Sequence, residues 1–226
     1  ILLKKSLLVL DDGVIEGRKV FGNLLKYIRM GASSNFGNMF SVLGASALLP
    51  FLPMAPIQVL TNNLLYDISQ TAIPSDEVDE EELLQPRHWD IKHIAHYILM
   101  VGPISSLFDY ATFALMYFYF KARTPELDGL FHTGWFVESL LTQTLIIHII
   151  RTAKIPFFES RASSALITTT LIICCVGIAL PFTWVGSTLG FTPLPWLYWP
   201  LVAAMLVTYS ILTHFMKVWF VRRWGM

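Results

Sequence analysis

Apolar residues in this chain gather into six long runs, separated by short polar or proline-containing segments. A helix needs roughly 20 mostly apolar residues to cross the hydrocarbon core of a bilayer. In lipid, only helices and closed barrels satisfy their backbone hydrogen bonds. We therefore expect an all-α fold, a polytopic membrane protein with a six-helix transmembrane bundle. The expected spans lie near residues 26–50, 55–73, 94–119, 132–151, 162–182 and 196–220.

Composition supports a membrane environment and argues against a nucleic-acid partner. Hydrophobic residues make up 54% of the chain and charged residues 14%. Such a composition is typical of chains whose solvent is lipid. The formal net charge is zero, so the electrostatic attraction that dominates nucleic-acid binding is missing.

The basic residues predict the orientation. Short cytoplasmic loops carry an excess of Lys and Arg. If both ends of the chain are cytoplasmic, fourteen of the sixteen basic residues face the cytoplasm and only Lys121 and Arg123 lie outside. We therefore expect both termini in the cytoplasm.

The polar side chains inside the apolar runs are the candidate functional residues. Asn35 and Asn38 lie in the first run, and Asn62, Asn63 and Asp67 lie in the second. A short hairpin with Pro50, Pro53 and Pro56 joins the two runs. An ionisable group at membrane depth is by default a functional hypothesis, and two such helices together could hold a cation.

Two further acids lie at membrane depth: Asp109 in the third run and Glu138, which opens a polar turn with Ser139, Thr142 and Gln143, in the fourth. Neither these acids nor Asp67 has a Lys or Arg at matching depth. Each must be protonated, hydrogen-bonded or paired with a cation.

Ligand chemistry favours a hard cation. Carboxylate and amide oxygens suit Mg²⁺ or Ca²⁺, whereas zinc or copper would call for Cys, His or Met clusters. Calcium favours several carboxylates, whereas magnesium is often held through one or two carboxylates and its own waters. The amide-rich set leans toward magnesium, although ligand type alone does not settle selectivity.

Small residues and acids mark two further segments. Ser33, Gly37, Ser41 and Ala45 recur every four residues, a stripe that lets helix backbones approach closely. Six acids lie among the seven residues 76–82. We expect a solvated loop there; the alternatives are contact with a basic partner surface or weak sensing of divalent cations.

Ser33-Ser-Asn-Phe-Gly-Asn38, the proline hairpin and Asn62-Asn-Leu-Leu-Tyr-Asp-Ile-Ser-Gln70 resemble the fifth and sixth membrane helices of P-type cation-transporting ATPases. The likeness is closest to the bacterial magnesium-transporting branch, type IIIB, and covers essentially the whole chain. It implies an occluded cation site alternating between the two membrane faces. Metal ligands implied by the resemblance are Asn35, Asn38, Asn63, Asp67 and Asp109, with Asn62, Tyr66, Gln70 and Glu138 as a second tier.

The resemblance also implies a division of the chain. Residues 1–13 are expected to end the phosphorylation domain and 14–30 to form a cytoplasmic stalk helix. Residues 26–73 would form the two ion-site helices, 74–93 an acidic cytoplasmic loop, 94–220 four supporting helices and 221–226 a cytoplasmic C-terminus.

Several motifs of the family are missing from this sequence: Asp-Lys-Thr-Gly-Thr, Gly-Asp-Gly, Thr-Gly-Glu-Ser and the Pro-Glu break of the fourth helix. With no initiator Met, the chain is expected to be the C-terminal membrane half of a pump, helices five to ten, and inactive alone. The intact protein would be a Mg²⁺-transporting ATPase of the bacterial inner membrane that imports the ion. ATP with Mg²⁺ would bind the absent cytoplasmic domains, and the N-terminal part of the pump would be this chain's partner.

Three alternatives remain at this point. The chain could belong to a P-type ATPase for another cation such as calcium, it could be a self-contained six-helix channel or carrier, or it could be a membrane scaffold that transports nothing.

Overall fold

Helices form nearly all of the regular structure in a computed structural model of the chain, which describes residues 6–79, 83–84, 89–152 and 154–224. Within these ranges there is no β-strand, so the predicted all-α class is confirmed. The helices are α1 (Leu7–Leu48), α2 (Pro56–Gln70), α4 (Ile91–Ala114), α5 (Asp128–Ile150), α6 (Ser164–Ala179), α7 (Trp184–Thr188) and α8 (Tyr198–Trp224). Short helical turns are η1 (Ile73–Ser75), η2 (Leu115–Tyr119), η3 (Pro125–Leu127) and η4 (Leu180–Phe182).

Local sequence fixes several helix starts. Asp90 accepts hydrogen bonds from the backbone N–H groups of Lys92 and His93, and so caps α4. The Ser163 hydroxyl accepts from the Leu166 N–H and caps α6. Pro56 is the first residue of α2, where a missing N–H costs nothing.

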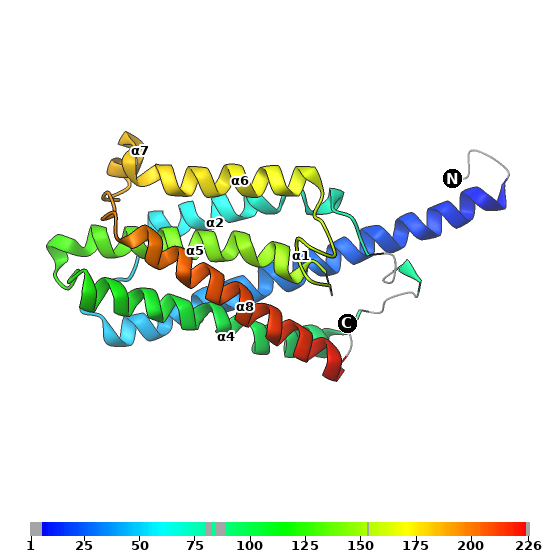
Figure 1. Ribbon diagram of the computed structural model, residues 1–226, viewed down its shortest axis with the longest axis horizontal. Coiled ribbons are helices and arrows are strands. Elements are labelled where there is room, and N and C mark those ends of the chain that lie inside the picture. Colours follow the sequence, from blue (N-terminus) through cyan, green and yellow to red (C-terminus); the bar gives the residue numbers. More distant parts are fainter. Residues whose placement is uncertain (1–5, 80–82, 85–88, 153, 225–226) are drawn as a thin grey trace.

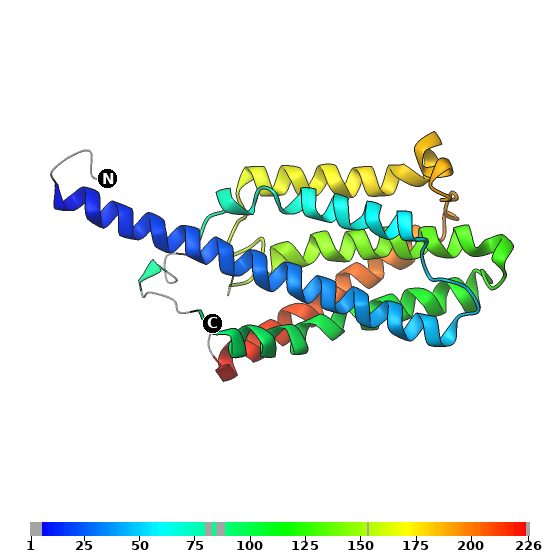
Figure 2. The same cartoon turned by 180° about the vertical axis from the view of Figure 1, so that it is seen from behind.

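Four helical segments are long and apolar enough to cross a membrane: Ile91–Tyr119, Pro125–Ile150, Ser164–Phe182 and Tyr198–Trp224. They coincide with the last four predicted spans. The first two predicted spans fall on α1 and α2, which differ from these four. α2 has only 15 residues, and the second half of α1 is interrupted by Asn and Ser side chains. Both helices nevertheless pack within the same bundle (Figures 1 and 2).

α5 is the centre of the bundle. Of its most apolar stretch, 94% is buried, against 28% for α6 and 22% for α8. It contacts α1, α2, α4, α6 and α8, whereas large apolar side chains of α6 and α8, such as Leu171 and Phe215, point outward. An exposed apolar exterior around an enclosed helix is the arrangement expected in lipid.

α1 packs on α4 through its small residues. Ser33, Gly37, Ser41 and Ala45 are all buried. A Cβ added at Gly37 would collide with the Ser105 hydroxyl and the backbone carbonyl of Gly102. The predicted close approach of helices along this stripe is therefore confirmed.

The first part of α1 projects beyond the bundle, at the end where α8 finishes (Figures 1 and 2). α1 is one continuous helix of 42 residues, or about 63 Å at the usual rise per residue. It therefore reaches from outside the bundle to the far end of the interior.

At the end of the bundle from which α1 projects, Asp76 joins four segments, an arrangement we call the Asp76 clamp. Its Oδ2 accepts hydrogen bonds from Lys26 Nζ of α1 at 3.1 Å and from Arg151 Nε, just after α5, at 2.8 Å. Its Oδ1 accepts from the Ser163 backbone N–H before α6 at 3.0 Å. Burial alone would raise the pKa of Asp76, but the hydrogen bond from Arg151 and the charge of Lys26 hold this pKa below its usual value.

The prediction of a solvated loop at 76–82 is therefore wrong for Asp76, which is only 6% exposed, and holds for Glu77, which is exposed. Residues 80–82 lie outside the described ranges. The local sequence could not reveal the difference, because the two cations that pair with the Asp76 carboxylate are distant in sequence. Lys26 lies 50 positions before it and Arg151 lies 75 positions after it.

We expect Asp76→Asn to lower the thermal stability of the intact protein in detergent, because two buried cations lose their carboxylate. Removing one partner of a buried ion pair costs about 3–5 kcal/mol. Because the folded pKa is depressed, the stabilisation is fully present above the ordinary carboxyl pKa of about 4 and is lost as pH falls through the folded pKa. Thermal unfolding as a function of pH should show parent and variant converging only in strong acid.

Asp79→Asn is the matched control. Asp79 accepts hydrogen bonds from the hydroxyls of Thr152 and Ser160, and the buried cation that it influences, Lys217, keeps three backbone carbonyls as acceptors when Asp79 is neutralised. A loss in this variant as large as that of Asp76→Asn would contradict the role assigned to the buried cations.

Candidate functional site

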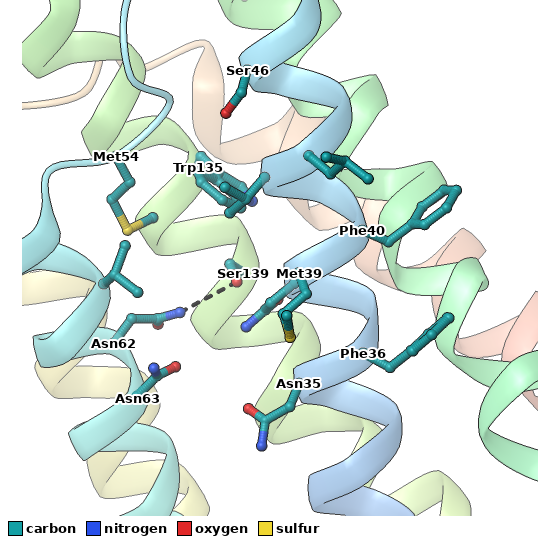
Figure 3. A pocket seen from close by; sticks show the side chains of 14 residues that line it. Asn35, Phe36, Met39, Phe40, Ser46, Met54, Asn62, Asn63, Trp135 and Ser139 are labelled. Carbon is teal, nitrogen blue, oxygen red and sulfur yellow. Dashed lines mark hydrogen bonds between the residues drawn. The ribbon is translucent and has the colours of Figure 1, made fainter. Parts of the chain in front are cut away.

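A groove of about 870 Å³ runs between α1 and α2, with α5 as its floor. Four amide side chains and two hydroxyls line it: Asn35, Asn38, Asn62, Asn63, Ser46 and Ser139. The rest of its wall is apolar or aromatic and includes Met54 and Trp135. In Figure 3, Asn35 on α1 and Asn63 on α2 point toward one another across the groove.

Helix geometry explains why these amides meet. Residues three or four apart share one face of a helix, so Asn35 and Asn38 turn the same way. Asn35 is exposed, Asn38 and Asn63 are half-buried, and Asn62 is buried. The structure thus brings together three of the five first-tier predicted ligands and one of the second tier.

Asp67 lies outside this groove. It is exposed and lines a second pocket of about 400 Å³, with Tyr27, Gln70 and Pro74 among its neighbours. It follows Asn63 by four residues, so it lies one turn farther along the same face of α2, roughly 6 Å toward η1. The carboxylate and the asparagines are neighbours along α2 but do not share a pocket.

Asp109 is buried behind the groove. Its Oδ2 accepts a hydrogen bond from the Ser41 hydroxyl at 2.6 Å, and its Oδ1 accepts from the Trp135 indole N–H at 2.7 Å. Trp135 lines the groove, so its indole links the groove wall to the acid behind it. Asp109 therefore already has two strong donors.

Glu138 is fully buried beside Asp109. Neither of its carboxyl oxygens accepts a hydrogen bond from a donor group of the described residues. The nearby Thr142 hydroxyl donates instead to the backbone carbonyls of Glu138 and Ser139. A buried acid without donors is costly unless it is protonated or meets a cation.

The remaining second-tier residues are buried away from the groove. Tyr66 faces the side chains of Ser34 and Gln70. Gln70 also borders the pocket that contains Asp67. Among the described residues, no group of three or more His, Cys, Asp or Glu side chains is positioned to hold a metal. A cation in the groove would depend on amide oxygens, with carboxylates farther away.

The predicted ligand set omitted Trp135, Ser139 and Gln143. All three lie on α5 at i, i+4 and i+8, a spacing that places them along one face. That spacing was visible in the sequence, but nothing in it showed that this face meets α2.

Together, the apolar exterior and the amide-lined groove define a membrane helix bundle with a polar interior. Residues 51–219 match the family model described as cation transporting ATPase, C-terminus. The chain belongs to this family and is a multi-pass membrane protein. The resemblance inferred from the motifs is thereby confirmed.

Three relatives illustrate the likeness. The chain is 54% identical over 225 residues to the protein named Magnesium-transporting ATPase, P-type 1, of Salmonella typhimurium (strain 14028s / SGSC 2262), covering 100% of this chain and 25% of that protein. The same figures hold for the protein of that name in Escherichia coli (strain K12). Identity to the Calcium-transporting ATPase of Bacillus subtilis (strain 168) is 24% over 208 residues, 87% of this chain and 23% of that protein. This chain thus spans about a quarter of the length of these relatives.

We expect Trp135→Phe to reduce stability by about 1–3 kcal/mol, because a buried Asp109 oxygen loses its donor while an aromatic ring still lines the groove. Thermal unfolding of the purified intact protein measures the loss. Trp196→Phe is the control, since Trp196 is 80% exposed. Equal losses in the two variants would show that the hydrogen bond to Asp109 is unimportant.

Proposed function

We propose that this chain is the membrane part of an ATP-driven magnesium transporter and that the groove between α1 and α2 binds the ion in transit. The observation that carries the proposal is the meeting of four asparagine amides in one groove, within a chain 54% identical to proteins named as magnesium-transporting ATPases. By the same family likeness, the ion moves into the cytoplasm.

The groove suits a partly hydrated ion. Magnesium dehydrates reluctantly and usually keeps several waters in an octahedral shell. Six waters occupy about 180 Å³ at their share of liquid volume, well below the volume of the groove. Neutral amide oxygens can accept hydrogen bonds from such a shell, while Asp67, one turn away, supplies negative charge.

Calcium is the second candidate, because the Bacillus subtilis relative is named a calcium-transporting ATPase. Calcium sites favour several carboxylates at direct bonding distance. The groove lining contains amides and hydroxyls but no carboxylate. This donor set favours magnesium.

We further propose that the end from which α1 projects faces the cytoplasm of a bacterial inner membrane. Lys26, Arg151 and Lys217 gather at that end, where Arg151 and Lys26 meet in the Asp76 clamp and Lys217 donates to carbonyls just beyond α5. Lys121 and Arg123 follow the opposite end of α4. This asymmetry supports the proposed orientation.

ATP with Mg²⁺ would be bound by the remaining three quarters of the pump, which is this chain's partner. Phosphorylation there would move α1, and the continuous helix would carry the motion to Asn35 and Asn38. A self-contained channel would need neither ATP nor the rest of the pump. Ion conduction by the isolated chain would therefore favour the channel over the pump.

In the intact protein, Asn38→Ala and Asn63→Ala should each raise the Mg²⁺ concentration that half-saturates ATP-driven uptake by about tenfold, with Mg²⁺–ATP held at saturation; this is the effect of losing roughly 1.4 kcal/mol of binding. Asp67→Asn should abolish transport while the protein remains folded and inserted, because the charge balancing the cation is gone. Uptake assays measure both effects.

Thr168→Ala is the control, because Thr168 is an exposed residue of α6 whose hydroxyl bonds within its own helix. Normal uptake by Asp67→Asn, or unchanged Mg²⁺ dependence in both asparagine variants, would remove the assignment of the site.

Asn38→Glu should strengthen calcium competition relative to magnesium, because it adds a carboxylate to a groove that has none. The measurement is ATPase activity of the intact protein with Mg²⁺ fixed and Ca²⁺ varied. If the variant keeps the parent's preference, charge at this position does not set ion selectivity.

A further inference from the structure

Ser139 lies on α5 at the floor of the groove, where two amides converge on its hydroxyl. Its Oγ accepts a hydrogen bond from Asn62 Nδ2 of α2 at 3.3 Å and one from Gln143 Nε2, one turn farther along α5, at 2.6 Å. Figure 3 shows the first of these bonds. All three side chains are at least 96% buried.

The oxygens of the two amides have no such partner. Asn62 Oδ1 and Gln143 Oε1 are both buried and accept no hydrogen bond from the described residues. A buried carbonyl oxygen left without a donor is costly. In this arrangement each amide donates one N–H to Ser139, while its oxygen has no donor. The orientation of the two amides therefore calls for an explanation.

Amides have two nearly equivalent orientations, one presenting oxygen and the other NH₂. Oxygen attracts a cation or accepts from its water shell, whereas NH₂ repels it. A hydroxyl oxygen has two lone pairs and can accept from both amides at once. With each NH₂ group bound to Ser139, each amide oxygen turns away from the hydroxyl.

We propose that Ser139 is a positioning residue that holds the Asn62 amide with its oxygen, rather than its NH₂ group, available to the transported cation. Asn62 and Ser139 both line the groove, and Gln143 supports the arrangement from behind. This inference deepens the proposed function and depends on it. α5 suits the task because it is the most enclosed helix, so the hydroxyl stands on a rigid support.

The test compares Ser139→Ala with the parent in the intact protein, using ATP-driven Mg²⁺ uptake into sealed vesicles at varied Mg²⁺ on the uptake side, with Mg²⁺–ATP held at saturation on the other side. Without its acceptor, the Asn62 amide can turn its NH₂ group toward the ion. We expect the half-saturating Mg²⁺ concentration to rise about three- to tenfold, with the maximal rate within about twofold of the parent. Ser139→Thr keeps the hydroxyl and should behave like the parent.

Thr144→Val is the matched control, because it removes another buried hydroxyl from α5. The Thr144 hydroxyl donates to the carbonyls of Leu140 and Leu141 in its own helix. A general effect of losing a buried hydroxyl would appear in this variant too. We expect its Mg²⁺ dependence to match the parent.

A second background separates orientation from packing. Asn62→Asp replaces the NH₂ group by oxygen, so either orientation of the side chain presents oxygen. Ser139→Ala should then change the half-saturating Mg²⁺ concentration by less than about twofold relative to Asn62→Asp alone, since positional coupling of the pair is removed. This comparison remains informative if Ser139→Ala in the parent folds poorly.

Three results would overturn the inference: an unchanged half-saturating Mg²⁺ concentration in Ser139→Ala, a change in maximal rate alone, or an equal effect in Thr144→Val. An undiminished effect in the Asn62→Asp background would do the same. Failure of the proposed function looks different, because the unmodified pump would then hydrolyse Mg²⁺–ATP without taking up Mg²⁺.

Discussion

The buried carboxylate of Asp76 is the interaction on which the arrangement of the groove depends. It neutralises Lys26 of α1 and Arg151 after α5, and it also receives the backbone N–H that precedes α6. α1 otherwise packs chiefly on α4, whereas α2 packs on α5 and α6. The two helices that line the groove therefore have different main packing partners, although both also contact α5. Because an unpaired buried charge is so costly, the clamp fixes the middle of α1, at Lys26, relative to the segment that follows α2, without filling the space between the two helices.

α5 supplies the floor of the groove and its polar side chains. It is enclosed by five other helices, and its side chains contribute Trp135 and Ser139 to the groove and Glu138 to the interior behind it. Polar groups at this depth are tolerated because protein rather than lipid surrounds them. The same enclosure also fixes the positions of these polar groups, since tight packing restricts the rotation of buried side chains. The lipid-facing α6 and α8 could not offer comparable positions.

Spacing patterns within single segments predicted the fold well, whereas contacts between separate helices could not be predicted from the sequence. The apolar runs identified the helices, and the small-residue stripe predicted a close helix contact along α1, because both depend on spacing within one segment; that α4 is the partner came from the structure. The candidate asparagines also follow from local spacing. The sequence could not show that Asp67 lines another pocket or that Ser41 and Trp135 bind Asp109, because these relations depend on how separate helices are rotated against each other. Asp76 illustrates the same limit: within a run of acids, only its distant cations distinguish it.

The two buried acids behind the groove differ in their hydrogen-bond partners, which bears on how a divalent ion in the proposed site would be balanced. Asp109 already accepts hydrogen bonds from Ser41 and Trp135, which stabilise its charge. Glu138 accepts none from the described donors, so its charge would be far less favourable. Two adjacent carboxyl groups in one apolar region do not both ionise readily. Of the two buried acids, Asp109 is therefore the one whose hydrogen bonds favour the charged form, and Asp67 lies exposed outside the groove. In the proposed site, Asp109 and Asp67 would balance a doubly charged cation without placing a carboxylate in the groove itself, because both lie outside the groove lining, and the ion's water shell would be left to the asparagines.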